Sequence, residues 1–323
     1  MGRPTVVITH WVHDEVLRLL EESCIVVPNT THETLPRAEI LRRSRAADGL
    51  MAFMPDRIDE EFLLQCPRLK VIGAALKGYD NFDVDACLQR GITFSNVPEL
   101  LTEPTAELAV ALLLGIDRNI LTGDGQVRSG RFNGWRPVLY GKGVAGSTVG
   151  IVGMGAIGQA VAERLRGFRC QLLYSDPHSA GQEVHASLRL TRLPLDELLV
   201  QCDFIVLTVP LTSQTRHLIN SEALAGMKGG AYLINVGRGS VVDESAVSAA
   251  LGSGHLAGYA ADVFEFEDWA RNDRPLAIHP ALLANSDRTL FTPHLGSAVD
   301  NARREIAMEA ARMILSTLNV TIR

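Results

Sequence analysis

Short runs of apolar residues alternate with longer segments of mixed polarity along the first hundred residues of the chain. The runs are rich in β-branched residues, as in "TVVIT" from Thr5, whereas intervening segments such as "DEEFLLQC" have helical spacing. Strands that alternate with helices of this length build βαβ units and a parallel sheet. The pattern therefore predicts strands near residues 5–9, 24–27, 49–53, 69–75 and 92–96.

The same alternation restarts after residue 147. Before it, the apolar segment from Leu100 to Ile120 predicts a buried helix with Thr102 as its N-cap, and a polar, glycine-rich loop follows. Strand-like runs then recur, which is enough for a six-stranded doubly wound sheet; they lie at residues 148–153, 170–176, 203–210, 230–236, 256–264 and 289–294.

At 323 residues the chain is long for one hydrophobic core. The fold class that we expect is α/β with two domains and a cleft between them. We expect residues 100–296 to form a doubly wound, Rossmann-type domain. Residues 1–99 form a smaller, flavodoxin-like substrate domain, and an amphipathic C-terminal helix within 297–323 returns to complete it.

Composition narrows the function classes. Lys and Arg number 31 against 37 Asp and Glu, a net charge of −6, so we expect no nucleic-acid partner. The five cysteines are scattered without a C-x-x-C pair, which indicates neither a disulfide framework nor a metal site and favours a cytoplasmic location. No signal-peptide pattern is seen at the N-terminus, and the longest apolar stretch, from Leu108, is too short to span a membrane.

The stretch "TVGIVGMGAIG" carries the G-x-G-x-x-G pattern at Gly153, Gly155 and Gly158, directly after an apolar strand and at the start of a helix. The first glycine permits a tight turn, the second lets the backbone approach a pyrophosphate, and the third allows close helix–strand packing. The N–H groups at the helix start favour phosphate. The pattern alone is weak evidence, but its position between a strand and a helix predicts a dinucleotide site.

Asp176 ends the second strand of this domain, in "LLYSD". An acidic side chain at this spacing accepts hydrogen bonds from the adenosine ribose hydroxyls. It also repels a 2′-phosphate, and no arginine follows closely in the sequence to attract one. The sequence therefore predicts NAD rather than NADP as the cofactor.

Three further segments follow predicted strands, where open α/β sheets bind ligands: "INVGRGSVVDE" with Arg238, "DVFEFEDW" with Glu267 and "TPHLGSA" with His294. This order of arginine, glutamate and histidine after a dinucleotide fingerprint resembles the D-isomer-specific 2-hydroxyacid dehydrogenase superfamily. The resemblance covers nearly the whole chain. It implies that His294 is the catalytic acid or base, that Glu267 hydrogen-bonds its ring, and that Arg238 binds an anionic substrate.

The same resemblance implies further cofactor contacts, at Thr105, Ala156, Ile157, Pro210, Val236, Gly237 and Asp262.

Lys77, in "LKGYDNFDVDAC", puts a second full positive charge near the end of a predicted strand. A monocarboxylate hardly requires it, whereas a doubly charged oxyanion would. This block, with "MAFMPDRID", "RFNGWRPVLYGKG", "YAADVFEFEDWARNDRP" and "FTPHLGSAVDNARREI", resembles the phosphonate dehydrogenases, which oxidise phosphite to phosphate while reducing NAD. The resemblance implies a phosphite pocket made by Lys77 and Arg238, assisted by Gly78, Met54, Trp135, Tyr140, Ser297 and Arg303.

Other functions remain open. A glyoxylate or 2-keto acid reductase of the same superfamily shares Arg238, Glu267 and His294, and formate oxidation is a weaker rival. A non-catalytic NAD-sensing protein, such as the corepressors built on this fold, keeps the dinucleotide site. The helix and loop at residues 102–146 resemble the dimerisation region of the superfamily, so we expect a homodimer.

Overall fold

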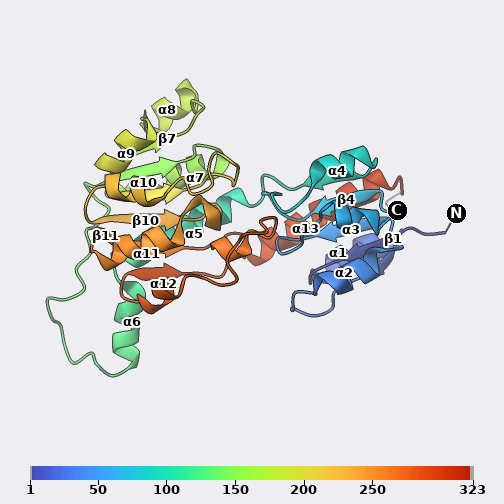
Figure 1. Cartoon of the computed structure of the whole chain (residues 1–323), viewed down its shortest axis with the longest axis horizontal. Coiled ribbons are helices and arrows are strands. Elements are labelled where there is room, and N and C mark those ends of the chain that lie inside the picture. The colour runs from blue at the N-terminus through green and yellow to red at the C-terminus, as the bar shows by residue number, and fades with distance from the viewer. Residues whose placement is uncertain (1, 321–323) are drawn as a thin grey trace. The chain divides into compact units, whose positions relative to one another are not determined.

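The computed structural model describes residues 2–320, which fall into two compact units (Figure 1). Unit 1 comprises the residues up to Leu101, Trp269–Asn272 and those from Ser297 onward, and unit 2 comprises Thr102–Asp268 and Asp273–Gly296. Both units contain a wholly parallel sheet covered by helices. The predicted α/β fold with two parallel-sheet domains is therefore confirmed.

The sheet of unit 1 has the strand order β2-β1-β3-β4-β5, which is the flavodoxin-like order. Its five strands coincide with the five apolar runs of the N-terminal sequence. They are β1 (Thr5–Ile8), β2 (Ile25–Val27), β3 (Gly49–Ala52), β4 (Val71–Ala74) and β5 (Thr93–Asn96).

Helices cover both faces of this sheet, and each face has its own apolar core. One face is covered by α1 (Asp14–Glu21) and α13 (Asp300–Thr317), and the other by α2 (Arg37–Ser44), α3 (Glu60–Leu64) and α4 (Val84–Gln89).

The C-terminal helix α13 belongs to unit 1 and lies beside the blue N-terminal strands in Figure 1. A glycine in β4 permits this approach, because a Cβ at Gly73 would lie 2.8 Å from the Ile314 side chain and 2.9 Å from the Ala310 carbonyl oxygen. Ile306 and Ile314 are fully buried in the shared core. The return of the chain to its first domain therefore has a packing reason in both elements.

Unit 2 has the strand order β12-β11-β10-β9-β6-β7-β8. The order reverses between β6 and β9, which is the topological switch point of a doubly wound sheet. The strands are β6 (Thr148–Val152), β7 (Gln171–Ser175), β8 (Thr191–Arg192), β9 (Phe204–Leu207), β10 (Ala231–Asn235), β11 (Leu256–Ala261) and β12 (Thr289–Phe291).

The sequence pattern predicts six strands here, and the seventh, β8, corrects that number. It is only two residues long, and both side chains are exposed. A strand this short and polar has no apolar alternation by which it could be recognised.

The helices of unit 2 also form two layers. One layer contains α5 (Thr102–Asp117), α7 (Ala156–Leu165) and α8 (Gln182–Leu188), and the other contains α9 (Leu195–Gln201), α10 (Ser221–Gly226), α11 (Glu244–Gly252) and α12 (Pro280–Ala284).

The helix predicted from Leu100 to Ile120 is shorter in the structure, where α5 ends at Asp117 and α6 (Ile120–Arg128) follows after a turn. Asn119 in that turn has a left-handed backbone conformation, which breaks the helix. The interior of α5 is buried against α7 and the sheet, as its apolar composition predicts. By contrast, α6 and the green loop after it extend away from the rest of unit 2 (Figure 1).

The segment Trp269–Asn272 lies within the predicted second domain but packs with unit 1. The Ala270 N–H donates to the Asn81 side-chain oxygen at 3.2 Å. The apolar and polar pattern of the sequence does not show that so short a loop packs with unit 1.

Candidate functional site

The glycine-rich turn joins β6 to α7 at the switch point of unit 2. Gly153 has φ +95°, a left-handed conformation that favours glycine, and a Cβ at Gly158 would collide with the Gly153 carbonyl oxygen. At Gly155, the N-cap of α7, a Cβ would meet no protein atom within 4 Å. Protein atoms therefore pack against Gly153 and Gly158, whereas the space beside Gly155, at the N-terminus of α7, can admit a ligand.

Asp176 follows β7 beside this turn and is largely buried. Its carboxylate accepts the Met154 N–H at 2.8 Å and the His178 N–H at 2.8 Å, so both oxygens are held in place. A carboxylate oxygen has further lone pairs, which leaves acceptors for ribose hydroxyls.

Arg192 corrects one sequence expectation, because an arginine does lie beside the Asp176 loop. Its guanidinium donates to the Asp176 carbonyl at 3.1 Å and to the Pro177 carbonyl at 2.7 Å. The pairing of β8 with β7 brings it there from 16 residues further along the chain. Its distance in the sequence hides its proximity in space.

The other predicted cofactor residues lie at the carboxyl ends of the unit 2 strands and in the helices beside them. Ala156 is exposed and Ile157 half-buried in the first turn of α7, and Pro210 is exposed after β9. Val236 and Gly237 follow β10, where a Cβ at Gly237 would lie 2.6 Å from the Val209 carbonyl oxygen.

Taken together, these features fit a dinucleotide. A glycine cradle, an open helix N-terminus of a ten-residue helix and an acidic side chain on the neighbouring strand are the three parts that such a cofactor requires. When bound, NAD supplies a hydride acceptor or, in reduced form, a hydride donor.

Glu267 and His294 form the most direct chemical pair in unit 2. The His294 Nδ1 lies 2.7 Å from Glu267 Oε2, and Glu267 Oε1 accepts the Phe264 N–H at 2.9 Å. Both side chains are partly buried, with 28% and 19% exposure. Because the carboxylate accepts a hydrogen bond from the Nδ1–H group, Nε2 is the nitrogen left to give or accept a proton.

Asp262 organises the turn that carries His294. One carboxylate oxygen accepts Thr292 Oγ1 and the Leu295 N–H, both at 2.6 Å, and the other accepts the Gly296 N–H at 2.8 Å. Burial raises the pKa of this carboxyl group, which is 1% exposed. His294 itself has φ +55°, an uncommon conformation for a side chain with a Cβ. Predicted as a cofactor contact, Asp262 also positions the turn that carries His294.

The predicted helix residue Thr105 lies beside this same turn. It is buried in α5, and a Cβ at Gly296 would lie 3.3 Å from its hydroxyl oxygen.

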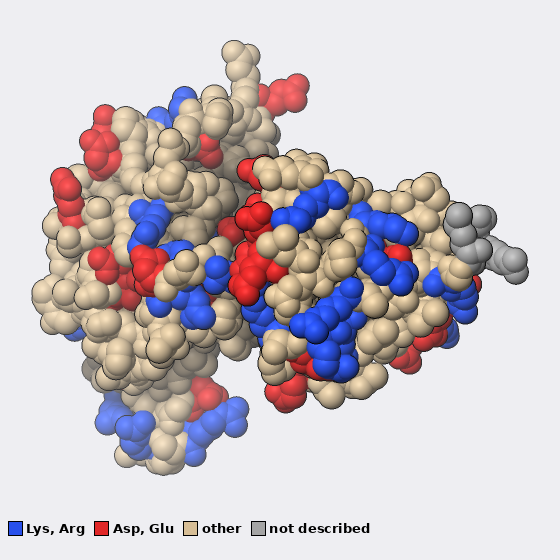
Figure 2. All heavy atoms as spheres, turned by 45° about the vertical axis from the view of Figure 1, so that its right-hand side comes forward, with Lys and Arg blue, Asp and Glu red and all other residues tan. Residues whose placement is uncertain are grey.

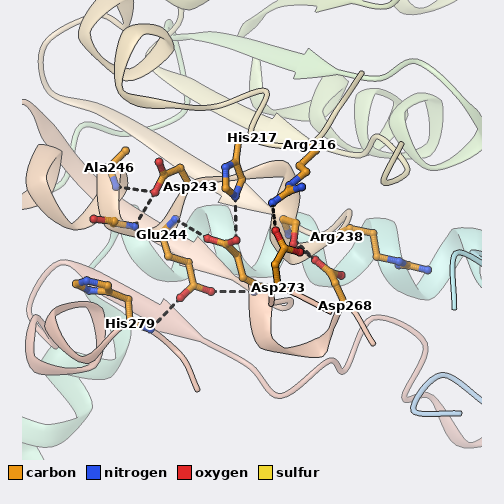
Figure 3. Close-up of polar contacts among 12 residues, drawn as sticks. Arg216, His217, Arg238, Asp243, Glu244, Ala246, Asp268, Asp273 and His279 are labelled. Atoms are coloured by element: carbon orange, nitrogen blue, oxygen red, sulfur yellow. Dashed lines mark hydrogen bonds and ion pairs between the residues drawn. The ribbon is translucent and has the colours of Figure 1, made fainter. Parts of the chain in front are cut away.

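Arg238 precedes the short 3-10 helix η2 (Gly239–Val241) and is half-buried. Its main-chain carbonyl accepts the Asn235 side-chain amide at 2.9 Å, and its guanidinium donates to the Gly237 carbonyl at 3.0 Å. In Figure 3 the Arg238 side chain extends to the right, away from Glu244 and His279.

A polar network that sequence reasoning missed joins the loop of Arg238 to η3 (Glu265–Glu267), the loop of Glu267. Ser240 donates to Asp268 through both its N–H and its hydroxyl group, and a Cβ at Gly239 would collide with the Phe264 backbone. These contacts hold the two loops against each other. Both residues lie in the segments quoted for Arg238 and Glu267, but nothing in their spacing indicates that they meet.

Behind this contact, Glu244 and Glu265 are both buried and each accepts the backbone N–H of the other, at 2.9 and 3.2 Å (Figure 3). His217 lies 2.9 Å from Glu265, and Glu244 also accepts the His279 N–H at 2.8 Å. Burial raises the pKa of Glu244. The network ties the loops after β9, β10 and β11 together.

The remaining predicted substrate residues lie in unit 1, apart from Trp135 and Tyr140, which lie in unit 2. Lys77 follows β4 and is half-buried; burial lowers the pKa of its ammonium group, and Glu99 opposes that effect. The Lys77 carbonyl accepts the Asn96 side-chain amide at 2.8 Å, which fixes the turn that also contains Gly78. Met54 is half-buried after β3, and its carbonyl accepts the Asn81 side chain at 3.0 Å.

Arg303 and Ser297 are neighbours in unit 1, with Arg303 Nη1 lying 3.3 Å from the Ser297 hydroxyl oxygen. The guanidinium also lies 3.4 Å from the Ala75 carbonyl and 5.5 Å from the centre of the Phe53 ring.

Trp135 and Tyr140 are 80% and 74% exposed in the loop after α6. The packing of unit 2 therefore does not hold them in a pocket, and their pocket role stays a prediction.

Across residues 2–320 no group of three or more His, Cys, Asp or Glu side chains is arranged to hold a metal ion. The five cysteines are free, and four of them are buried. No described helix is both long and apolar enough to cross a membrane. Acidic and basic side chains lie among uncharged ones on the face drawn in Figure 2.

Comparison with known proteins places these features in context. The sequence profile described as "D-isomer specific 2-hydroxyacid dehydrogenase, NAD binding domain" matches residues 110–296. A glyoxylate reductase of Pyrococcus horikoshii is 38% identical over 319 residues, covering 97% of this chain and 92% of that protein. One from Thermofilum pendens is 38% identical over 321 residues, covering 98% and 92%.

Solved structures agree with this result. The TT0316 protein of Thermus thermophilus superposes with a TM-score of 0.87 at 36% identity, covering 98% of this chain and 97% of that one. A D-lactate dehydrogenase of Aquifex aeolicus, solved with NAD and lactic acid, superposes with a TM-score of 0.83 at 27% identity, covering 98% and 95%.

Proposed function

Since the chain belongs to the D-isomer-specific 2-hydroxyacid dehydrogenase family and is an oxidoreductase with a NAD-binding domain, we propose that it oxidises phosphite to phosphate with NAD as hydride acceptor. The single observation that supports this substrate is the pair of partly buried cations in unit 1, Lys77 and Arg303, at the carboxyl-terminal edge of its sheet. Two cations at one sheet edge suit an anion that carries two charges.

The reaction assigns a role to each side chain. The P–H bond breaks with its electron pair leaving as hydride, a P–O bond forms to water, and that water loses a proton. Glu267 holds Nδ1 of His294, so Nε2 accepts this proton. The resemblance to the phosphonate dehydrogenases implies that Arg238 and Lys77 each bind phosphite oxygens and stabilise the charge that develops on them.

A second candidate is the reduction of glyoxylate or another 2-keto acid. The names of the relatives, glyoxylate reductases at 36–38% identity over nearly the whole chain, support it directly. The same pair serves that reaction, because His294 Nε2 would donate a proton to the carbonyl oxygen while hydride arrives from the reduced cofactor.

The test follows NADH absorbance with NAD and phosphite, and separately with glyoxylate and NADH. Lys77→Met is compared with Lys70→Met, a 64% exposed lysine just before the same strand. We expect phosphite-dependent NADH formation that falls about 100-fold or more in Lys77→Met and is unchanged in Lys70→Met. Glyoxylate reduction without phosphite oxidation would replace the proposal by the second candidate. Turnover of neither would favour a non-catalytic NAD-binding protein.

Asp176 supports a preference for NAD over NADP as part of this proposal, because its carboxylate lies where a 2′-phosphate would come close.

We also propose that the protein is a homodimer formed through α6 and the loop after it. This segment exposes large apolar side chains, which mark an interaction surface; they are Ile120, Leu121, Val127, Phe132, Trp135, Val138 and Tyr140. Light scattering of the purified chain tests this, and a monomeric mass would exclude the dimer.

A further inference from the structure

The inference concerns His10, Asp56 and Arg303, which meet at the carboxyl-terminal edge of the unit 1 sheet. In the order β2-β1-β3-β4-β5, the switch point lies between β1 and β3. His10 follows β1 and Asp56 lies in the loop after β3, so both are placed where open α/β sheets bind ligands. Asp56 lies within the block "MAFMPDRID", but the sequence assigns no role to either residue.

Within residues 2–320, only one of the two carboxylate oxygens of Asp56 has hydrogen-bond partners. Its Oδ2 accepts the Thr9 hydroxyl at 2.5 Å and the Phe53 N–H at 2.7 Å. Its Oδ1 is buried and has no hydrogen-bond partner among the described residues. The residue is 2% exposed, and this burial raises the pKa of its carboxyl group to about 6.

His10 faces that unsatisfied oxygen. Its Nε2 lies 3.8 Å from Asp56 Oδ1 and is likewise buried without a hydrogen bond within the described chain. The separation exceeds a hydrogen bond by less than about 1 Å. The centre of the His10 ring lies 5.3 Å from the centre of the Phe53 ring. The Arg303 guanidinium carbon lies 5.5 Å from the centre of the same Phe53 ring.

The charge of Arg303 adds to the effect of burial on His10. Burial first, and then the charge of Arg303, lower the pKa of His10 to about 4. Arg303 makes long contacts of 3.3 and 3.4 Å to neutral oxygens, and no carboxylate of residues 2–320 forms an ion pair with it. A guanidinium with five donors and no anionic partner can still accept an anion.

We propose that His10 takes up a proton when a small anion binds beside Arg303. The anion cancels the field of the guanidinium at the imidazole, so the proton enters from solvent and Nε2 closes onto Asp56 Oδ1. The charged groups that face His10 are Asp56, from the loop after β3, and Arg303, from α13.

His10 and Asp56 are therefore positioning residues that couple anion binding to protonation. The coupling grows with the charge of the anion, so it favours a doubly charged oxyanion over a monocarboxylate. The inference rests on the proposed function only for the identity of the anion.

The first experiment needs no ligand. The ring resonance of His10, identified by its loss in His10→Gln, is followed by NMR through a pH titration of the full chain. We expect the midpoint to rise by about one pH unit in Arg303→Met and to stay low in Arg303→Lys, which keeps the charge. An unchanged midpoint in folded Arg303→Met would overturn the inference.

The second experiment adds sodium phosphite, with sodium chloride at matched ionic strength as the control. The His10 midpoint should rise with phosphite in the wild type; this arm also decides the matter if Arg303→Met fails to fold. Phosphite that shifts other resonances of unit 1 but not the His10 midpoint would contradict the coupling. A protein that does not oxidise phosphite but shows the Arg303→Met effect would refute the proposed function and leave the coupling intact.

Discussion

The two sheets of this protein share one architecture and differ in the chemistry of their carboxyl-terminal edges. Both sheets are parallel, both are covered by helices on two faces, and each has a switch point at which the strand order reverses. The edge of unit 2 presents mainly glycines, backbone N–H groups and carboxylates, as at Gly153, Asp176 and Asp262, and Arg238 is the one cation among its predicted site residues. The edge of unit 1 presents Lys77 and Arg303.

This difference shows that strand order fixes where ligands bind but not which ligands bind. An edge with N–H donors and acidic acceptors suits a dinucleotide, whose phosphates and ribose need both. An edge with partly buried cations suits a small anion. The variants below act on one edge and should leave the other unchanged.

The largest effect is expected at the proton-transfer pair of unit 2. His294→Asn removes the titrating nitrogen but retains a polar side chain, so kcat should fall about 1000-fold while the Kd of NAD is unchanged. Steady-state kinetics and NADH fluorescence titration measure the two quantities. His32→Asn, an exposed histidine of unit 1, is the control and should be fully active. A fall of less than tenfold in His294→Asn would remove His294 from the reaction.

The next effect separates binding from packing. Gly158→Ala places a methyl group against the Gly153 carbonyl, so both NAD affinity and thermal stability should fall, the stability by about 1–3 kcal/mol. Gly155→Ala meets no protein atom, so NAD affinity alone should fall, by about tenfold. Calorimetry with and without NAD checks both. Equal losses of stability in Gly158→Ala and Gly155→Ala would contradict the role of Gly158 in packing and of Gly155 in cofactor approach.

A control in the other unit sharpens this contrast. Gly73→Ala, which crowds Ile314 and the Ala310 carbonyl, should lower stability without weakening NAD binding.

The third effect concerns cofactor choice. Asp176→Ala removes the acceptor for the ribose hydroxyls and leaves Arg192 beside the site, so KM for NAD should rise about tenfold while KM for NADP stays constant or falls. Asp176→Ala with Arg192→Gln should lose the gain for NADP. Initial rates with each cofactor decide the matter, and an equal rise for both would refute the preference.

Much of the fold could be predicted from sequence, because apolar β-rich runs mark buried strands of parallel sheets. β8 was missed since its two residues are exposed. Among site residues, Gly153, Gly158 and Asp176 could be found by their spacing, and the structure brings Glu267 and His294 into contact as the superfamily resemblance implies.

Residues that act through tertiary contact could not be found in this way. Asp56 lies far from His10 in sequence, and Ser240 meets Asp268 from 28 positions away. No local periodicity encodes such distances, since they depend on which loops the strand order brings together.

The smallest effect tests the proton-binding carboxylate of the unit 1 edge. The pKa of Asp56 is raised from 3.8 to about 6 by burial, so the native state binds this proton more tightly than the unfolded state does. Its contribution to stability is therefore fully present below about pH 4 and is lost as the pH rises to about 6, by at most about 3 kcal/mol.

Asp56→Asn has no such proton, so the wild type should lose stability relative to this variant between pH 4 and 6, and the difference should be constant above that range. Burial and Arg303 lower the pKa of His10, so titration of His10 makes the free energy of unfolding rise with pH in both proteins. The difference in unfolding free energy between the two proteins therefore reports on Asp56. Denaturant unfolding across this pH range measures it, with the exposed Asp85→Asn as a control that should show no pH-dependent difference. A difference that does not vary with pH would mean that folding leaves the pKa of Asp56 unchanged, and that burial does not make this carboxyl group hold its proton more tightly.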